Sequence, residues 1–323
     1  HEADKIQQDP AAALGGGGGV VVDGATSMLG LALIHECLDR NIPVLAICRA
    51  DSARLDVIPR EETIEIIRCD QGEFAGLNPA VRADYDVYYH FAWGHTKQEE
   101  RRKVSCQEQN IKYTIDAINL AKRLGCSRFV GAGSQAEYGR VSGMIGPDTQ
   151  VNPEVAYGIA KYAAGKMAFI ECESLQMECI WTRTFSVYGI NDNRTTMVMY
   201  AIDKLLKGEK PVFTKAEQTW DYLYSKDAGK AFFLIGEKGI SGKTYCIGKG
   251  ESRPLVDYIY ALRDAIEPSL ALGIGEVPYS PLQVMNLQVD ISHLREDTGF
   301  TPQYSFEEGI RETISWYQER YLR

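Results

Sequence analysis

Three polar side chains, Ser134, Tyr157 and Lys161, follow one another along the chain in an order that suits proton transfer at a carbonyl group. Tyr157 and Lys161 are four residues apart, so on a helix they share one face and the ammonium lies near the phenol. A nearby positive charge stabilises the phenolate, which makes Tyr157 a usable proton donor and acceptor. The Ser134 hydroxyl is suited to hydrogen bonding a carbonyl or alkoxide oxygen. Together these residues predict redox chemistry at a carbonyl.

The Tyr-x-x-x-Lys spacing alone is weak, because chance predicts about one such pair in a chain of this composition. Five occur, starting at Tyr157, Tyr162, Tyr200, Tyr222 and Tyr245. Only the first follows both Ser134 and a glycine turn, so we assign catalysis to that pair. Tyr162 and Lys166 fall on a neighbouring helix face, where we expect them to pack at an interface.

The glycine turn comes directly after an apolar run, residues 20–23, and opens a helix. A strand, a tight turn and a helix N-terminus present backbone N–H groups and a positive helix end to a pyrophosphate, which predicts a dinucleotide site. Ser27 stands where a middle glycine is usual, and its hydroxyl is placed to donate to a phosphate. The residues of this turn expected to bind the cofactor are Gly24, Thr26, Ser27, Met28, Leu29 and Gly30.

The residues after the second predicted strand indicate which cofactor is preferred. An acid there would bind the adenosine ribose, but Arg49 takes this place, with Ser52 and Arg54 close behind. A guanidinium suits a 2′-phosphate better than a free hydroxyl, so we predict NADP(H) as the preferred cofactor. Asp51 lies close enough to leave NAD(H) open. Asp70, just past the third strand, is placed to accept a hydrogen bond from the adenine amino group.

From residue 20 onward, short Val- and Ile-rich runs alternate with longer segments of helical period. This alternation predicts an α/β fold, a doubly wound parallel sheet of the Rossmann type with helices on both faces. We expect strands at residues 20–23, 44–48, 64–68, 87–91, 128–132 and 179–184, and helices at 29–40, 104–124 and 157–177. The last two helices carry small and apolar residues on more than one face, which suits packing against a second subunit.

The domain boundaries follow from composition. Residues 1–19 include five consecutive glycines and are expected to be a disordered tail or an expression scar outside the fold. The dinucleotide-binding domain is predicted at residues 20–185 and about 219–247, because residues 221–236 again show a strand followed by a helix. Residues 186–218 and 248–323 are predicted to form a smaller, less regular substrate-binding lobe, because Pro and Gly are frequent there. This lobe is expected to end in a helix at 306–321.

Composition also restricts the partners. The chain has 323 residues, 45% of them hydrophobic, and a formal net charge of −9 at pH 7. Nucleic acid and anionic membranes would repel it at long range, so neither is expected as a partner. The eight cysteines show no C-x-x-C pair or Cys/His ligand spacing, so we expect reduced thiols, no metal site and a cytoplasmic location.

Several segments resemble motifs of the extended short-chain dehydrogenase/reductase family, in its nucleotide-sugar epimerase, dehydratase and ketoreductase branch. They are Gly24-x5-Gly30, Asp70, His90-Phe91-Ala92-Trp93, Asn110, and residues 134–139, 157–161, 183–189 and 220–224. The resemblance implies a homodimer through the two long helices and further cofactor contacts from Gln71, Phe91, Ala92, Trp93, Asn110, Tyr157, Lys161, Thr184, Phe185 and Val187. It also implies a nucleotide-activated sugar as substrate, bound by Trp93, Gln135, Ser186, Arg194, Trp220 and Arg253.

Departures from the family pattern narrow the reaction. Dehydratases of this family carry an Asp-Glu pair directly after the catalytic Ser or Thr, whereas this chain has Gln135 and Ala136 there, so dehydration is not expected. Trp220 replaces an arginine that often contacts the nucleotide diphosphate, and Arg194 and Arg253 are candidates to compensate. Ser186 replaces an asparagine near the substrate.

Three hypotheses remain. The favoured one is NADPH-dependent reduction of a 4-keto sugar, with Tyr157 as proton donor and Ser134 holding the oxygen. The alternative is an NAD(P)-dependent C4 epimerase, in which the same triad serves a cofactor that stays bound. The third is a non-catalytic dinucleotide-sensing protein built on this fold, against which the intact triad argues.

Overall fold

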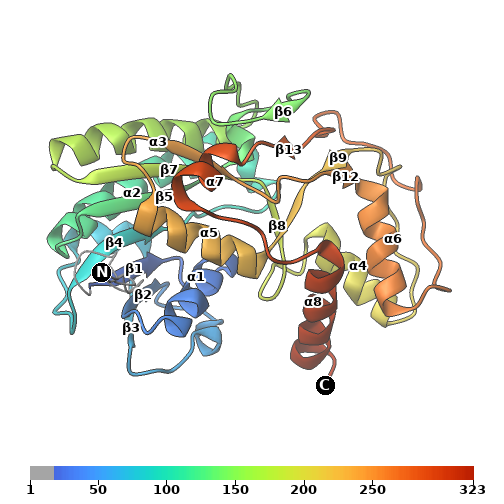
Figure 1. The fold of residues 1–323 in the computed structure, drawn as a ribbon, viewed down its shortest axis with the longest axis horizontal. Helices are drawn as coiled ribbons and strands as arrows, with labels where there is room; N and C mark the ends of the chain where they lie inside the picture. Colours follow the sequence, from blue (N-terminus) through green and yellow to red (C-terminus); the bar gives the residue numbers. More distant parts are fainter. Residues whose placement is uncertain (1–17) are drawn as a thin grey trace, which may run out of the picture.

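The computed structural model describes residues 18–323, and its core is a sheet of seven parallel strands (Figure 1). The strands are β1 Gly19–Asp23, β2 Val44–Cys48, β3 Ile64–Arg68, β4 Tyr85–His90, β5 Arg128–Ser134, β7 Glu178–Thr184 and β11 Thr244–Ile247. Their order across the sheet is β3-β2-β1-β4-β5-β7-β11. From β1 the chain continues to β2 and β3 on one side of the sheet, and from β4 it continues to β5, β7 and β11 on the other side. The loops that follow β1 and β4 therefore run in opposite directions and leave room for a ligand between them.

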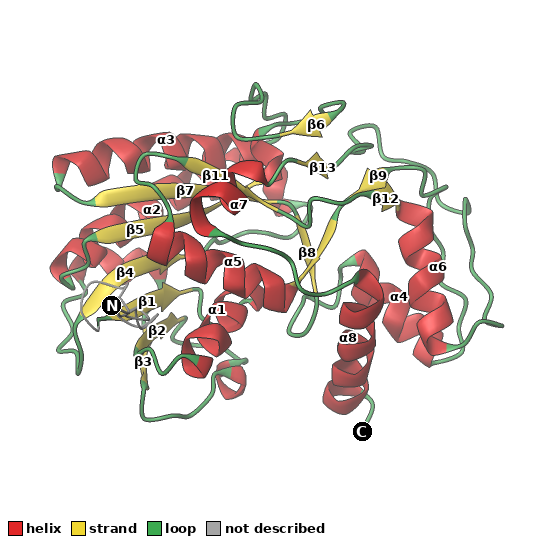
Figure 2. Cartoon of the chain, viewed as in Figure 1, coloured by secondary structure: helices red, strands yellow, loops and turns green. Residues whose placement is uncertain are grey.

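Two pairs of helices cover the two faces of the sheet (Figure 2). α1 Met28–Asp39 packs beside α5 Ser225–Lys238, and α2 Val104–Arg123 packs beside α3 Ala156–Ser174. Successive side chains of a strand point to opposite faces, so Val20 and Val22 enter one apolar cluster and Val21 enters the other. The predicted α/β, doubly wound fold is therefore confirmed.

Six of the seven strands lie where the sequence predicts them. The seventh, β11, is not predicted, because a run of four residues is too short to show a period. Residues 221–236 were expected to form a strand and a helix of this domain. The helix α5 is present, but the strand β10 Tyr222–Tyr224 pairs with β8 Ser186–Tyr188 in a separate two-stranded sheet. The chain returns to the central sheet through α5 and β11 instead.

The second lobe, at the right of Figure 1, is built from α4 Met197–Leu206, α6 Leu255–Ile266 and α8 Phe306–Tyr321. These helices bury a third apolar cluster around Phe306, Tyr188 and Tyr258. The predicted final helix is thus confirmed. The remaining short elements are η2 Leu55–Val57, η3 Gln71–Gly76, η4 Glu100–Arg102, η5 Gln135–Glu137, β6 Met144–Ile145, β9 Thr219–Trp220, β12 Arg253–Pro254, β13 Gln288–Val289 and α7 Ser292–Thr298.

Two segments near the expected boundaries differ in their packing. The predicted tail, residues 1–19, lies outside the described residues except for its end, and Gly19 already belongs to β1. Residues 248–323 were expected in the lobe, yet α7 packs on α5 and β11, and Leu287, Ile291 and Leu294 join the same apolar cluster as Val20. This segment crosses back over the dinucleotide-binding domain before the chain ends in the lobe.

Candidate active site

A cleft of about 910 Å³ opens at the carboxyl edge of the sheet. The glycine turn after β1, the ends of β2, β4 and β5, the start of α3 and the loop before α4 all contribute to it. The predicted residues that line it are Gly24, Thr26, Ser27, Met28, Leu29, Arg49, Gln71, Phe91, Ala92, Trp93, Ser134, Gln135, Tyr157, Lys161, Thr184, Phe185 and Val187. The fold therefore brings the triad and the glycine turn into one cavity.

Three residues predicted to bind the cofactor do not line the cleft. Gly30 is buried in the first turn of α1. The carboxylate of Asp70 accepts a hydrogen bond from the backbone N–H of Ala50 (3.1 Å). Asn110 is buried, and its side-chain amide is hydrogen-bonded to both backbone groups of Gly94 (3.0 and 2.9 Å). Gly30 and Asn110 thus support the walls of the cleft from behind.

Most of the predicted substrate residues also lie apart from the cleft. Arg194 is 3.7 Å from the carboxylate of Asp203, and Arg253 forms a 2.6 Å ion pair with Glu307. Ser186 begins β8 and does not line the cavity. Both arginines therefore have acidic partners within the lobe, and neither lines the cleft as a free cation.

The glycine turn depends on the absence of a side chain at Gly24. Its φ is 57°, and a Cβ there would lie 2.7 Å from the backbone nitrogen of Ala92. Ser27 caps α1: its Oγ donates to the carbonyl of Gly24 (2.7 Å) and accepts from the N–H of Gly30 (3.1 Å). The hydroxyl proton that we expected a phosphate to receive is therefore used to hold the turn itself.

Asp23, the last residue of β1, is a site residue that the sequence analysis did not single out. Its buried carboxylate accepts from the backbone N–H groups of Phe91 (2.7 Å) and Ala92 (2.8 Å), and from Tyr88 Oη (2.9 Å) and His90 Nδ1 (2.6 Å). These bonds fix the end of β4 against the glycine turn. The sequence signal for Asp23 is its position as an acid at the end of an otherwise apolar strand. A buried carboxylate there needs hydrogen-bond donors around it, so it is expected to tie neighbouring segments together.

The catalytic candidates Ser134, Tyr157 and Lys161 all line the cleft. Burial raises the pKa of Tyr157, while the charge of Arg101 and a hydrogen bond with Ser134 lower it. Lys161 lies one turn further along α3, and its Nζ donates to the carbonyl of Ala132 (2.6 Å). Burial lowers the pKa of Lys161 to about 7. These groups can hold a carbonyl oxygen and exchange a proton with it.

Residues of the segment between β4 and α2 surround the Tyr157 ring. The Arg101 Cζ lies 4.7 Å from the ring centroid, and Trp93 packs edge-on with the two centroids 6.2 Å apart. Lys161 Nζ is 5.8 Å from the Tyr157 centroid and 4.0 Å from that of Trp93. The sequence predicts Lys161 as the charge beside the phenol. It gives no role to Arg101, although the run Arg101-Arg102-Lys103 marks a basic segment.

A buried ion pair between Glu137 and Arg183 lies next to the backbone of Ser134. The Glu137 carboxylate accepts from the backbone N–H of Ser134 (2.8 Å) and from Arg183 Nε (3.0 Å), and both charged side chains are buried. Burial raises the pKa of Glu137, and the charge of Arg183 opposes that shift. The Ser-x-x-Glu spacing of a capping box is visible in the sequence and predicts the first contact. No local spacing predicts Arg183 as the partner.

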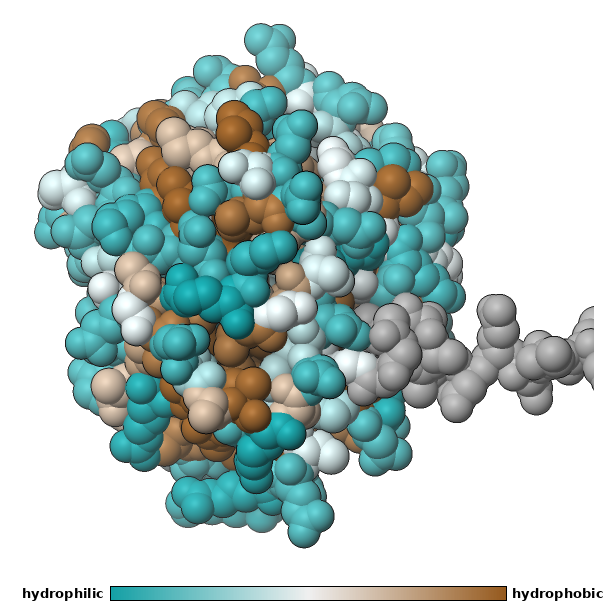
Figure 3. All heavy atoms as spheres, turned by 90° about the vertical axis from the view of Figure 1, so that its left-hand side faces the viewer, coloured by the Kyte–Doolittle hydropathy of each residue, from teal (hydrophilic) through white to brown (hydrophobic). Residues whose placement is uncertain are grey.

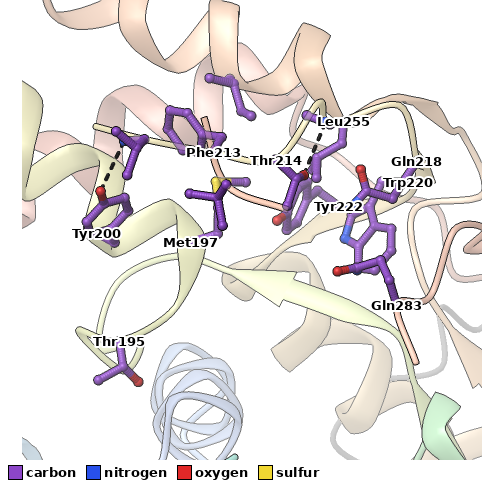
Figure 4. Close-up of a pocket in the computed structure, with 14 residues that line it drawn as sticks. Thr195, Met197, Tyr200, Phe213, Thr214, Gln218, Trp220, Tyr222, Leu255 and Gln283 are labelled. Carbon is purple, nitrogen blue, oxygen red and sulfur yellow. Dashed lines mark hydrogen bonds between the residues drawn. The ribbon is translucent and has the colours of Figure 1, made fainter. Parts of the chain in front are cut away.

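A second pocket, of about 380 Å³, lies within the lobe (Figure 4). Its walls come from Met197, Tyr200, Phe213, Tyr222, Leu255 and Ile259 among others, and none of the described residues that line it is charged. In Figure 4, Gln218 and Trp220 lie toward one end. The Oε1 of Gln218 and the Nε1 of Trp220 are buried and have no hydrogen-bond partner within residues 18–323. Gln218 and Trp220 thus add one unpaired acceptor and one unpaired donor to an uncharged pocket, whose other polar lining residues are Thr195, Tyr200, Thr214, Tyr222 and Gln283.

Residues 18–323 hold no group of three His, Cys, Asp or Glu side chains arranged to bind a metal ion. None of the helices in this part of the chain combines the length and apolar composition of a membrane span.

The model of the NAD dependent epimerase/dehydratase family matches residues 20–248, so the chain belongs to this family. The dTDP-glucose 4,6-dehydratase of Streptomyces niveus is 25% identical over 257 residues, which cover 78% of this chain and 74% of that protein. The resemblance inferred from the motifs is confirmed.

Solved structures of similar fold include two epimerases. UDP-N-acetylglucosamine 4-epimerase from Methanobrevibacter ruminantium M1 has a TM-score of 0.83 and 21% identity, over 94% of this chain and 99% of that one. UDP-glucuronic acid 4-epimerase from Bacillus cereus, solved with UDP-glucuronic acid and NAD, has a TM-score of 0.81 and 20% identity, with the same coverage. These likenesses confirm the fold.

Proposed function

We propose that this protein is an NADP(H)-dependent oxidoreductase that reduces the 4-keto group of a nucleotide-activated sugar. The observation that carries the proposal is that Ser134, Tyr157 and Lys161 line the same cleft as the glycine turn and Arg49. One end of the cavity suits a dinucleotide phosphate, and the other can transfer a proton at a carbonyl.

The residues of the cleft fit a dinucleotide. Gly24 allows the tight turn from β1 into α1, so that a pyrophosphate can lie at the positive N-terminal end of this helix. The Oε1 of Gln71 and the Oγ1 of Thr184 belong to cleft-lining residues and are buried without a partner among the described residues. Unpaired buried polar atoms are rare in native proteins, so a bound ligand is expected to pair with them.

The side chains then divide the chemistry. The bound nicotinamide cofactor supplies the hydride. Ser134 Oγ hydrogen-bonds the carbonyl oxygen of the substrate, and Tyr157 donates its phenolic proton to that oxygen as negative charge develops there. Lys161 binds the ribose of the cofactor and helps to stabilise the phenolate. Neither Gln135 nor Ala136 can act as an acid, which favours simple reduction over dehydration.

Arg49 supports the preference for NADP(H). It directly follows β2 and lines the cleft, and within residues 18–323 its guanidinium makes no hydrogen bond or ion pair that would compete with a 2′-phosphate. Arg54 lines the cleft as well, but one of its terminal nitrogens donates to the carbonyl of Asn191 (3.0 Å). NAD appears in the name of the family and in the Bacillus cereus complex, so the preference has to be measured directly.

The alternative function is C4 epimerisation of a nucleotide sugar. The observation that favours it is the likeness to two 4-epimerases over nearly the whole of their chains. An epimerase oxidises and then reduces the same carbon with one cofactor that stays bound, whereas a reductase must exchange its cofactor at every turnover. Occupancy of the purified protein therefore separates the two functions.

The test is to denature the purified protein and identify any released nicotinamide cofactor by mass spectrometry, with its ratio to protein. An empty site that then binds NADPH in preference to NADH, and oxidises NADPH with a 4-keto nucleotide sugar, supports the reductase. Near-stoichiometric NAD, together with interconversion of C4 epimers, supports the epimerase and overturns our interpretation of Arg49.

The pocket within the lobe is proposed to hold the nucleotide end of the substrate. Its apolar walls and the unpaired groups of Gln218 and Trp220 suit an uncharged planar ring with adjacent donor and acceptor atoms. Thr195 lines this pocket, while Asn191 and Asn193 of the same loop line the cleft, so the two cavities lie on either side of one loop. A nucleotide sugar that reaches from Tyr157 into the lobe would occupy both.

We also propose a homodimer through α2 and α3, as in the sequence-based interpretation. Ile159 (52% exposed), Met167 (45%) and Ile170 (69%) form an exposed apolar stripe on α3, and Val104 on α2 is 71% exposed. Hydrophobic patches are visible on the face shown in Figure 3, which is the left-hand side of Figure 1. Light scattering tests this proposal.

All eight cysteines are unpaired, which supports a cytoplasmic location.

A further inference from the structure

The catalytic tyrosine has a second cation beside it. Arg101, in η4, places its Cζ 4.7 Å from the centroid of the Tyr157 ring. Both residues line the cleft. A guanidinium above a phenol ring interacts more favourably with the phenolate than with the neutral phenol, because the charge on the phenolate is spread over the ring.

The position of Arg101 is fixed by the loop that carries it. Its Nε donates to the carbonyl of Thr96 (2.7 Å). Gln107 of α2 is buried and donates to the carbonyls of His95 (2.9 Å) and Glu100 (3.3 Å), so the loop is tied to the helix behind it. Besides the Thr96 bond, the Arg101 guanidinium has no hydrogen bond or ion pair within residues 18–323, so no carboxylate there neutralises it.

The other charged groups around Tyr157 cannot replace this cation. Lys161, on the same helix, is buried, its ammonium lies over Trp93 at 4.0 Å, and the pKa of Lys161 is about 7. Glu137, in η5, raises the pKa of Tyr157, although its own carboxylate is paired with Arg183. At neutral pH, Arg101 is the one group in this set with a permanent, unpaired positive charge.

We propose that Arg101 is a positioning residue that keeps Tyr157 usable as an acid and base by stabilising its phenolate. This role of Arg101 rests on one part of the proposed function, namely that Tyr157 is the proton donor. When Tyr157 gives its proton to the substrate oxygen, the electron pair of the broken O–H bond stays on the phenol oxygen, and the Arg101 guanidinium shares the resulting charge. No other co-reactant is needed for this step.

The direct test is a pH titration of tyrosinate absorbance on the full-length protein. The spectrum of each protein minus that of its Tyr157→Phe counterpart isolates Tyr157 from the other tyrosines. Because the Arg101 side chain is exposed, we expect Arg101→Met to move the Tyr157 midpoint upward by about half a pH unit to one pH unit, and Arg101→Lys to move it less, because the charge is kept. Arg102→Met removes a neighbouring exposed cation that does not line the cleft, and it should leave the midpoint unchanged.

The pH profile of kcat/KM gives the second readout. In Arg101→Met, the part of the profile that reports Tyr157 ionisation should move to higher pH by the same amount. At pH 7, kcat should fall about threefold with KM little changed, because a weaker acid transfers its proton more slowly. Arg101→Lys should restore much of the rate.

An unchanged Tyr157 midpoint in Arg101→Met would overturn the proposal. If KM rises at the same time, Arg101 is a ligand of the substrate instead. A shifted midpoint in a protein that turns over no nucleotide sugar would leave this inference standing and remove the proposed function. Arg101→Gln repeats the test if the Met variant does not fold.

Discussion

The cleft and the lobe pocket differ most in charge. The cleft is lined by five cationic side chains, Arg49, Arg54, Lys97, Arg101 and Lys161, and by two acids, Glu100 and Asp192. None of the described residues that line the lobe pocket is charged. Under the proposed function, the two cavities would hold different parts of one ligand. The cleft would bind the phosphates and carry the proton transfer, and the lobe pocket would hold an uncharged group.

The largest expected effect comes from the phenol in the cleft. Tyr157→Phe should lower kcat by about a thousandfold, because it removes the proton donor, and should leave the affinity for NADPH nearly unchanged. Steady-state rates and fluorescence titration with NADPH measure the two quantities. Tyr162→Phe is the matched control, since it alters the adjacent Tyr-x-x-x-Lys pair and should keep full activity. Persistent turnover in Tyr157→Phe would refute the assigned acid.

The charges behind the cleft are expected to matter for stability. Glu137→Gln leaves Arg183 buried without a counter-charge, and breaking such a pair costs about 3–5 kcal/mol. Urea unfolding should therefore show a clearly lower midpoint. Glu154→Gln removes the partner of Arg140, a pair that lies on the surface, and should leave the midpoint where it is. Equal effects of the two substitutions would contradict the assignment of a structural role to the Glu137 pair.

The proposed 2′-phosphate site at Arg49 can be tested through cofactor choice. Arg49→Glu should weaken NADPH binding by about tenfold to a hundredfold, because a charge-assisted bond to the 2′-phosphate is lost, and should change NADH binding little. Isothermal titration with both cofactors measures this. Arg68→Glu, at the end of the neighbouring strand β3 and outside the cleft, is the control. Equal losses for the two cofactors would exclude a 2′-phosphate site at Arg49.

The smallest effect is expected in the neutral pocket. Gln218→Leu removes a buried acceptor that has no partner, so the free protein should become slightly more stable. The same change should raise the KM of the nucleotide sugar about fivefold while kcat stays constant, since the lost hydrogen bond is made equally in the ground state and the transition state. Thermal unfolding and kinetics measure the two effects. A fall in kcat with no change in KM would show that the lobe contributes to the chemistry itself.

Much of the sheet and of the cleft is predictable from short spacings. The alternation of strands and helices predicts the doubly wound fold, since each element shows its own period. The glycine turn and the Tyr157–Lys161 pair are local as well, because residues four apart on a helix must share a face. The strand β11 is not predicted from the sequence, because four residues are too few to show an alternation of apolar and polar side chains.

The residues that the sequence does not reveal are those joined by long-range contacts. Glu137 and Arg183 are 46 positions apart and meet through the pairing of β5 with β7. The lobe pocket combines α4, the segment around Gln218 and α6. Arg253 carries the right charge for a phosphate, but its carboxylate partner, Glu307, is 54 positions away along the chain.

The sequence by itself determined the fold class, because each strand and helix shows its own period. It also predicted the glycine turn and the set of Ser134, Tyr157 and Lys161, because these depend on spacings of a few residues. Only the tertiary structure decided that Arg101 lies over the Tyr157 ring and that Gln218 and Trp220 remain unpaired in a neutral pocket. These contacts depend on how loops pack across the molecule, and neither the period of a helix nor that of a strand constrains that packing.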